Sequence, residues 1–146
     1  MTYKSQLGKI GEDIACEYLV DNKYKIIERN FRQKWGEIDI IAKAPNKTLV
    51  FVEVKTVRDV EKLHSENDKQ QNIGQISAED QLTGAKLTKL QRTASLYANH
   101  NPEMVNDEKG WQIDLLAITI KGTCPELAEG LTISKKDYVI KYYENI

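Results

Sequence analysis

The sequence is poor in cysteine, histidine and proline, and it has no long apolar run. Its 146 residues include two cysteines, two histidines and three prolines. Cys16 and Cys124 lie far apart, without the neighbouring cysteines or histidines of a zinc site, so we expect both to be free thiols. His64 and His100 leave little material for a Ser-His-Asp or Cys-His mechanism. No stretch approaches the roughly 18 apolar residues that a membrane span needs.

The start of the chain, "MTYKSQLGKIGEDIA", lacks the apolar core of a secretory signal peptide. We therefore expect a cytoplasmic protein with no membrane association. The length allows a single domain over residues 1–146 to bury a hydrophobic core without disulfides. The formal net charge is −1, whereas proteins that bind nucleic acid through its phosphates are usually basic. Any DNA-binding surface must therefore be local.

The spacing of apolar residues predicts two helices and five strands. Helices are expected at residues 6–20 and 82–100, and strands at 24–32, 36–43, 48–56, 111–120 and 137–143. This order of helix, three strands, helix and two strands predicts an α/β sandwich with a mixed sheet. Gly8 and Gly11 interrupt the first helix, at a cost of roughly 1 kcal/mol each relative to alanine. We therefore expect another backbone to approach that helix face closely.

One segment, residues 57–85, has no convincing helical or strand period and carries more acidic than basic residues. An irregular excursion of this length is typically a functional flap or a disordered segment. We predict a mobile loop within the single domain, and this loop could also dock a protein partner.

The stretch "WGEIDIIAKAPNKTLVFVEVKT" reads as a hairpin that places acids within two apolar strands. Because strand side chains alternate between faces, a tight even-length turn would set Asp39 opposite Val52 and send Glu53 to the other face. An odd-length loop or a bulge would place Asp39 and Glu53 on one face. It would also gather four apolar side chains on the other face: Ile38, Ile40, Val52 and Val54. We predict this second arrangement.

Two carboxylates side by side near a lysine would suit Mg²⁺ or Mn²⁺. Such ions take a few carboxylate oxygens and several waters, and they often complete their shell with substrate phosphate. The predicted metal ligands are Asp39, Glu53 and the carbonyl of Val54. Lys55 would position or help deprotonate the attacking water in a phosphodiester hydrolysis. The alternative is a solvent-facing hairpin with a weak Asp39–Lys55 cross-strand pair.

Asp39, thirteen intervening residues and then "EVK" resemble the Asp…Glu-x-Lys core of the PD-(D/E)xK nuclease superfamily. Four motifs in order, "GKIGEDIACEYL", "WGEIDIIA", "FVEVKT" and "IDLLAI", resemble the bacterial YraN-like proteins, relatives of archaeal Holliday-junction resolvases. The resemblance covers most of residues 7–120. It implies a restriction-endonuclease-like sandwich, in which a mixed five-stranded sheet is flanked by helices.

The resemblance also implies catalytic roles for Glu12, Asp39, Glu53 and Lys55, with Glu12 completing the site from the first helix. It implies Mg²⁺- or Mn²⁺-dependent cleavage of DNA, on branched or damaged substrates. Glu12 as a solvated helix residue, and Glu37 as either a supporting or an exposed side chain, remain open. No proline precedes Asp39, and the link after Lys55 is longer and more acidic than the family pattern. A catalytically inactive nucleic-acid- or protein-binding module that retains the fold is the alternative function.

Lys34, Lys86, Lys89 and Arg92 are the residues predicted to bind DNA phosphates. The last three recur at three-residue steps along the second helix, where an ordinary solvated helix face is the alternative. Gln91 is a further candidate for contact with water or phosphate. A C₂ homodimer would suit a two-fold-symmetric junction, although the sequence shows no self-complementary patch. We expect Asp114 to be a buried structural acid that needs hydrogen-bond partners.

Overall fold

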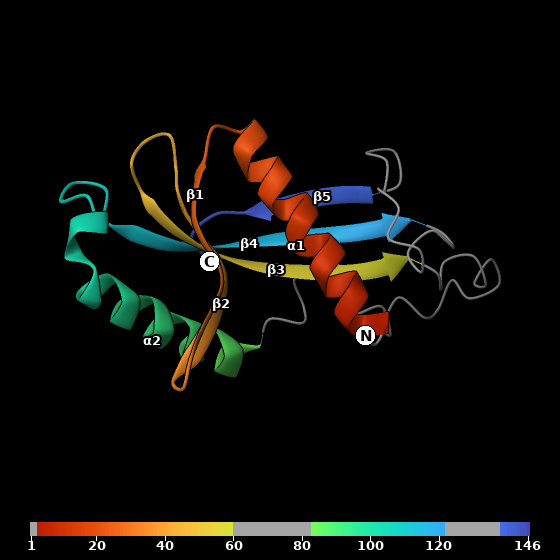
Figure 1. The fold of residues 1–146 in the computed structure, drawn as a ribbon, viewed down its shortest axis with the longest axis horizontal. Helices are drawn as coiled ribbons and strands as arrows, with labels where there is room; N and C mark the ends of the chain where they lie inside the picture. The colour runs from red at the N-terminus through yellow and green to blue at the C-terminus, as the bar shows by residue number, and fades with distance from the viewer. Residues whose placement is uncertain (1–2, 60–82, 122–137) are drawn as a thin grey trace.

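Two helices pack against a five-stranded sheet in the computed structural model, which describes residues 3–59, 83–121 and 138–146 (Figure 1). In chain order the elements are α1 (Tyr3–Asp21), β1 (Lys25–Gln33), β2 (Gly36–Lys43), β3 (Leu49–Asp59), α2 (Gly84–His100), the short 3₁₀ helix η3 (Pro102–Met104), β4 (Trp111–Lys121) and β5 (Tyr138–Tyr143). The order predicted from the sequence is confirmed.

The strands lie in the sheet in the order in which they occur in the chain. The β3–β4 pair is parallel, while β1–β2, β2–β3 and β4–β5 are antiparallel. β4 lies between β3 and β5, as its nearly continuous apolar run predicts. The predicted α/β fold with a mixed five-stranded sheet is therefore confirmed, and it is consistent with a restriction-endonuclease-like fold.

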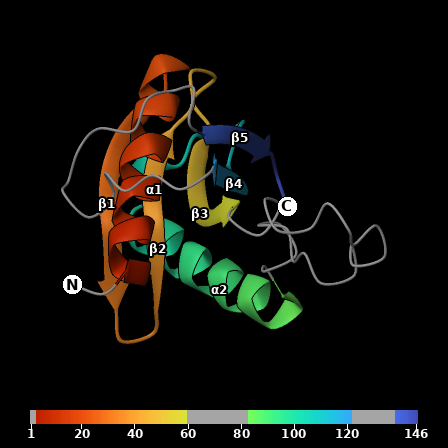
Figure 2. The ribbon, with the colours of Figure 1, turned by 90° about the vertical axis from the view of Figure 1, so that its right-hand side faces the viewer.

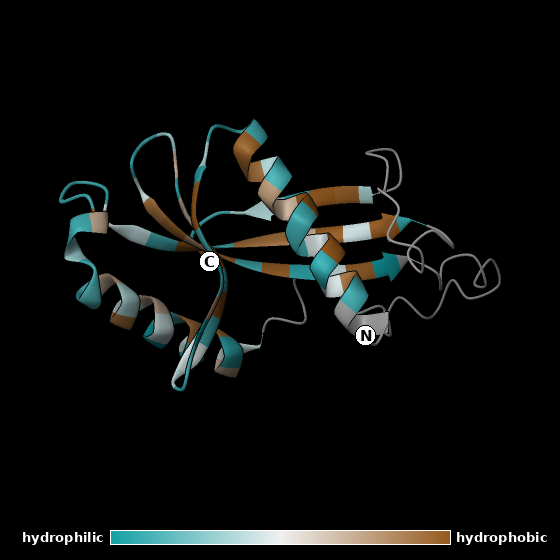
Figure 3. Cartoon of the chain, viewed as in Figure 1, coloured by the Kyte–Doolittle hydropathy of each residue, from teal (hydrophilic) through white to brown (hydrophobic). Residues whose placement is uncertain are grey.

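Helix α1 covers one face of the sheet (Figure 2). Its apolar residues recur along one side, so polar and apolar positions alternate along the ribbon (Figure 3). The buried side chains of this first core are Ile14, Ala15, Leu19, Ile40, Ala42, Val50, Val52, Leu116, Ile118 and Ile120. Burial of each large aliphatic side chain contributes about 1.5–3 kcal/mol to stability.

Helix α2 packs on the opposite face. Thr83 caps its first turn by accepting a hydrogen bond from the backbone N–H of Lys86. The second core contains Ile38, Ile41, Leu49, Phe51, Leu90, Ala94, Tyr97 and Ile113. A series of ring contacts with centroids 5.2–5.8 Å apart crosses it, from Trp35 through Phe31, Tyr97 and Phe51 to Trp111. These contacts fix the β1–β2 hairpin against α2.

The two glycines of α1 have different surroundings. A Cβ on Gly11 would overlap the side chain of Thr56, so this position does require a close approach. Gly8 is exposed, and a Cβ there would meet nothing within 4 Å. A close approach does occur at Gly11, but the neighbour is a side chain rather than the backbone that the sequence predicts, and at Gly8 the prediction is wrong.

The β1–β2 hairpin reverses its faces part of the way along. Ile40 belongs to the core under α1, whereas Ile38 belongs to the core under α2. The expectation that both isoleucines share one face is therefore wrong. Between the paired residues Arg29 and Phe31, Asn30 has a left-handed backbone with φ 53°, which breaks the regular alternation. The far end of the hairpin turns steeply away from β3 (Figure 1).

Most of the predicted mobile loop at residues 57–85, with its suggested partner site, lies outside the described residues. Its two ends are regular, because β3 continues through Asp59 and Thr83 caps α2. Cys16 is a free thiol, as predicted, whereas Cys124 lies outside the described residues. No described helix is long and apolar enough to cross a membrane.

Candidate functional site

β2 and β3 separate at the point where each strand carries an acid. The ladder between them ends at the pair Ile40–Val52, and the next residues are Asp39 on β2 and Glu53 on β3. Because each acid follows one member of a directly opposed pair, both lie on the same face. The connecting loop, residues 44–48, has five residues. The predicted odd-length loop is confirmed, and Asp39 does not pair with Val52.

Asp39, Glu53 and Lys55 form a largely buried cluster at this separation. Oδ2 of Asp39 accepts a hydrogen bond from the backbone N–H of Val54 at 2.9 Å, beyond the last ladder pair. Nζ of Lys55 lies 3.4 Å from Oε1 of Glu53, and the two side chains are 19% and 18% exposed. The alternative of a solvent-facing hairpin with an Asp39–Lys55 pair does not describe this geometry. Lys55 pairs with Glu53 instead.

Burial raises the pKa of both carboxylates. Burial raises the pKa of Glu53 to about 7, and the charge of Asp39 adds to the rise, while Lys55 opposes it. Burial also raises the pKa of Asp39, against the lowering effects of the Val54 N–H and of its hydrogen bond with Glu53. Near neutral pH the pair therefore tends to retain a proton. A divalent cation could take the place of that proton.

The donor set fits a hard divalent cation. Asp39 and Glu53 supply carboxylate oxygens, and Mg²⁺ sites commonly use one or two carboxylates with several waters. In a strand the N–H and C=O of one residue point to the same edge, so the Val54 carbonyl faces the same separation as its N–H. Across residues 3–59, 83–121 and 138–146, no three Asp, Glu, His or Cys side chains are close enough to hold an ion by themselves. The roles of Asp39, Glu53 and Val54 as ligands remain predictions.

Glu12 approaches this region from α1. The amide of Asn30 faces its carboxylate, and with the amide nitrogen turned toward Glu12 it donates to both oxygens, at 2.9 and 3.2 Å. Burial raises the pKa of Glu12, the charge of Asp39 raises it further, and the Asn30 hydrogen bond lowers it. Glu12 and Asp39 are therefore electrostatically linked, and Glu12 is half-buried rather than fully solvated. Its catalytic role remains a prediction.

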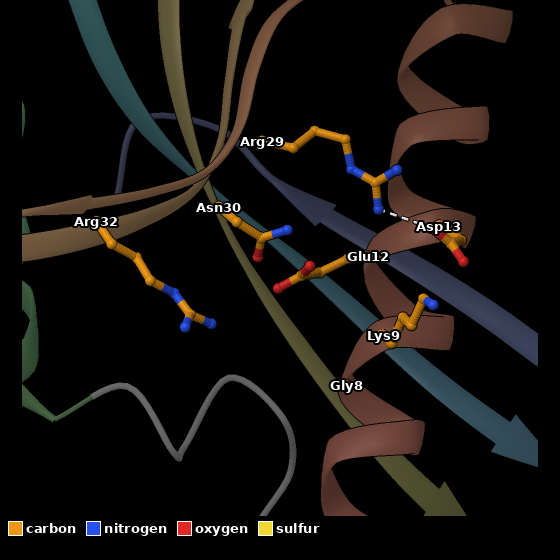
Figure 4. A pocket seen from close by; sticks show the side chains of 7 residues that line it. All are labelled: Gly8, Lys9, Glu12, Asp13, Arg29, Asn30 and Arg32. Atoms are coloured by element: carbon orange, nitrogen blue, oxygen red, sulfur yellow. Dashed lines mark hydrogen bonds and ion pairs between the residues drawn. The ribbon is translucent and has the colours of Figure 1, made fainter. Parts of the chain in front are cut away.

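A groove of about 570 Å³ lies beside Glu12, between α1 and β1 (Figure 4). Its lining residues are Gly8, Lys9, Glu12, Asp13, Arg29, Asn30 and Arg32. One guanidinium nitrogen of Arg29 lies 2.7 Å from Oδ1 of Asp13, which ties β1 to α1. Arg32 lies 3.9 Å from Glu37, and both side chains are about three-quarters exposed. Glu37 is therefore an exposed residue rather than part of the acidic cluster.

The residues predicted to bind phosphate lie apart from the acidic cluster in sequence and are all exposed. Lys34 is in the turn between β1 and β2, and Lys86, Lys89 and Arg92 lie along α2. Gln91, on the same helix, is also exposed. The structure supports their accessibility, and their contact with DNA remains a prediction.

Asp114 has the structural environment that the sequence predicts. Its side chain is buried, and Oδ1 accepts hydrogen bonds from Nε2 of Gln112 at 2.8 Å and from the backbone N–H of Asn145 at 2.9 Å. The hydroxyl of Tyr142 donates to Oδ2. The same bond, with burial, raises the pKa of Tyr142. Asp114 therefore joins β4 to β5 and the chain end.

Sequence reasoning missed Asn30 and the Arg29–Asp13 ion pair. An asparagine inside the strand-forming run "KIIERNFRQ" is a detectable signal, because asparagine is depleted in strands and enriched in left-handed conformations. The ion pair had no such signal, since its partners are 16 positions apart on different elements.

Comparison with known proteins shows a family match that includes the residues of this site. The family model described as "Uncharacterised protein family UPF0102" matches residues 11–118. A UPF0102 protein of Campylobacter concisus is 36% identical over 126 residues, covering 86% of this chain and 93% of that protein. One of Campylobacter lari is 38% identical over 111 residues, covering 76% and 81%. One of Geotalea uraniireducens is 62% identical over 53 residues, covering 36% and 41%. The range that the family model matches contains Glu12 and the whole acidic cluster.

Proposed function

We propose that this chain, which belongs to the uncharacterised protein family UPF0102, is a divalent-metal-dependent endonuclease that hydrolyses DNA phosphodiester bonds. The observation that carries the proposal is the convergence of Asp39, Glu53 and Lys55 where β2 and β3 separate. Two carboxylates provide hard oxygen ligands for Mg²⁺ or Mn²⁺, and the lysine adds a positive charge beside them. Metal-assisted hydrolysis of a phosphodiester uses this combination.

Residues of the acidic cluster would orient the reacting groups and place a positive charge near the phosphate. The Val54 N–H fixes one oxygen of Asp39, and a side-chain hydrogen bond links the same residue to Glu53. Lys55, held near Glu53, orients the attacking water and offsets negative charge that builds on the phosphate. A bound Mg²⁺ would supply Lewis acidity and lower the pKa of a coordinated water. The largely buried setting strengthens each of these electrostatic interactions.

Branched or damaged DNA is the substrate class that we favour, from the resemblance of the motifs to resolvases. Lys34, Lys86, Lys89 and Arg92 would contact its phosphates. A C₂ homodimer would present two acidic clusters to the two-fold-symmetric strands of a junction.

The second candidate is a catalytically inactive module that binds nucleic acid or protein. The observation that favours it is that both acids already have partners within the chain. Lys55 forms an ion pair with Glu53, and the Val54 N–H donates a hydrogen bond to Asp39. Such a module would bind DNA equally well with Mg²⁺ and with EDTA.

The test is cleavage of four-way junction, flap and linear DNA in Mg²⁺ or Mn²⁺. We expect the wild type to cut at least one of these, and Asp39→Ala and Lys55→Ala to lose at least about a hundredfold in rate. Asp107→Ala and Lys141→Ala change exposed residues outside the cluster and serve as matched controls. Equal cleavage by all variants would contradict the proposal. DNA binding without cleavage, unchanged in EDTA, would favour the second candidate.

A further inference from the structure

Asn30 has a backbone conformation that its strand does not require. Its neighbours Arg29 and Phe31 pair with Ile40 and Ile38 of β2, so by register Asn30 lies across from Asp39. Its φ of 53° is left-handed, a region that non-glycine residues seldom occupy within strands. Such conformations persist where the surrounding structure holds them, and they concentrate at functional sites.

The side chain of Asn30 holds the carboxylate of Glu12. With its nitrogen turned toward Glu12, the amide donates to both carboxylate oxygens, at 2.9 and 3.2 Å. The two side chains face each other from β1 and α1 (Figure 4). The amide is neutral, so it fixes the carboxylate without cancelling its charge. Because Glu12 and Asp39 repel each other, Glu12 needs a donor to remain near Asp39.

The cations around Glu12 have other partners or are freely hydrated. Arg29 forms its ion pair with Asp13 at 2.7 Å. Arg32 is about three-quarters exposed and lies 3.9 Å from Glu37. Lys9, on α1, is exposed. Asn30 is exposed as well, but its side chain is short and its amide donates to both oxygens, so it defines the direction of the Glu12 carboxylate better than these long side chains do.

We infer that Asn30 is a positioning residue, whose left-handed backbone turns its amide onto Glu12 and so holds this carboxylate near Asp39, the residue opposite Asn30 in the β1–β2 register. The inference rests on the proposed function, because it assigns to the Glu12 carboxylate a supporting task at the same centre. The carboxylate of Glu12, which α1 supplies, would then accept hydrogen bonds from water molecules bound at the acidic cluster. The left-handed residue Asn30 on β1 thus connects α1, through Glu12, to the strands that carry the acidic cluster.

The experiment compares Mn²⁺ affinity by calorimetry for wild type, Asn30→Gly, Glu12→Gln and the double variant. Glycine adopts the left-handed backbone without strain, so Asn30→Gly removes the amide and leaves the fold, which circular dichroism in EDTA verifies. The matched control is Asn145→Gly, since Asn145 has φ 51° and bonds to Asp114 only through the backbone N–H that glycine retains. Asp39→Ala reports on the proposed function itself.

We expect Asn30→Gly to weaken Mn²⁺ binding about tenfold, as loss of a supporting partner does. Glu12→Gln should weaken it to a similar degree, and Asn30→Gly should add less than about twofold to Glu12→Gln, because both changes remove the same element. Asn145→Gly should bind Mn²⁺ like the wild type. With DNA as substrate, Asn30→Gly should lower kcat and leave KM unchanged.

Two results would overturn the inference alone: unchanged binding in Asn30→Gly while Asp39→Ala loses it, or full additivity with Glu12→Gln. Unchanged Mn²⁺ binding in Asp39→Ala would overturn the proposed function, and the inference with it.

Discussion

The two acidic side chains at the end of the β2–β3 ladder share a largely buried environment with a single lysine. Asp39 and Glu53 are largely buried and interact directly, and one lysine lies beside them. Each carboxylate therefore favours its protonated form more than it does in water, and burial is the largest cause. A bound cation would offset the free-energy cost of burying these two carboxylates in their charged form.

The raised pKa of Glu53 makes stability depend on pH. The folded protein retains a proton on Glu53 up to about pH 7, whereas the unfolded chain releases it near the ordinary value of 4.5. Between these values the folded state binds more protons, so the free energy of unfolding falls as pH rises. In EDTA we expect wild type to lose about 1–3 kcal/mol relative to Glu53→Gln between about pH 5 and pH 8.

Urea unfolding at each pH measures this difference. Glutamine keeps the size of the side chain and cannot titrate, so it isolates the contribution of Glu53. If the free energy of unfolding changed with pH in the same way in both proteins, the pKa of Glu53 would not be raised in the folded state.

The sequence identified Asp39, Glu53 and Lys55 because strand alternation and an odd loop are simple rules of geometry. It did not identify the role of Asn30, because the carboxylate that its amide faces belongs to Glu12 on α1, distant in sequence. Local patterns contain no information about such contacts.

Helices and strands were largely predictable from apolar spacing. β2 matches its predicted range of 36–43, and the other elements differ by a few residues at their ends. The exception was the face reversal between Ile40 and Ile38. Period-two reasoning assumes a regular hairpin, whereas β1 has a register shift between Ile26 and Glu28 and a left-handed residue at Asn30. The resemblance to YraN-like proteins, drawn from four short motifs, is confirmed by the family match.

The two glycines of α1 offer a matched pair of variants. Gly8→Ala adds a methyl group in open space and improves helix propensity, so we expect a gain of about 0.5–1 kcal/mol in the free energy of unfolding. Gly11→Ala forces a methyl group into the side chain of Thr56, and we expect a net loss of about 1–2 kcal/mol.

Chemical denaturation of both variants measures the contrast, and Thr56→Ala added to Gly11→Ala should recover part of the loss. Equal stability of the two alanine variants would mean that α1 does not pack on β3 as described.

Charge over the entire chain is nearly balanced, with a net charge of −1. Binding to DNA must therefore depend on local groups of cations rather than on overall attraction. The exposed cations of α2 form one such group, on a helix whose first turns are mostly exposed. They lie on α2, whereas the acidic cluster lies on β2 and β3, so we expect binding and chemistry to be separable by mutation.

Removal of the α2 cations should weaken junction binding in EDTA and reduce the salt dependence of affinity. If each contacts one phosphate, the slope of log affinity against log salt should fall by about 2–3. Fluorescence anisotropy at several salt concentrations measures it. The variant combines three alanine substitutions, at Lys86, Lys89 and Arg92. The control combines three at other exposed lysines, Lys25, Lys109 and Lys141. Equal slopes for variant and control would exclude α2 as the contact surface.

Calorimetric titration of Mn²⁺ into the DNA-free protein tests the central claim most directly. We expect wild type and Glu144→Ala, which changes an exposed glutamate, to bind alike, and Glu53→Ala to bind at least about tenfold more weakly. No binding by wild type, or equal binding by Glu53→Ala, would contradict a metal centre at the separation of β2 and β3.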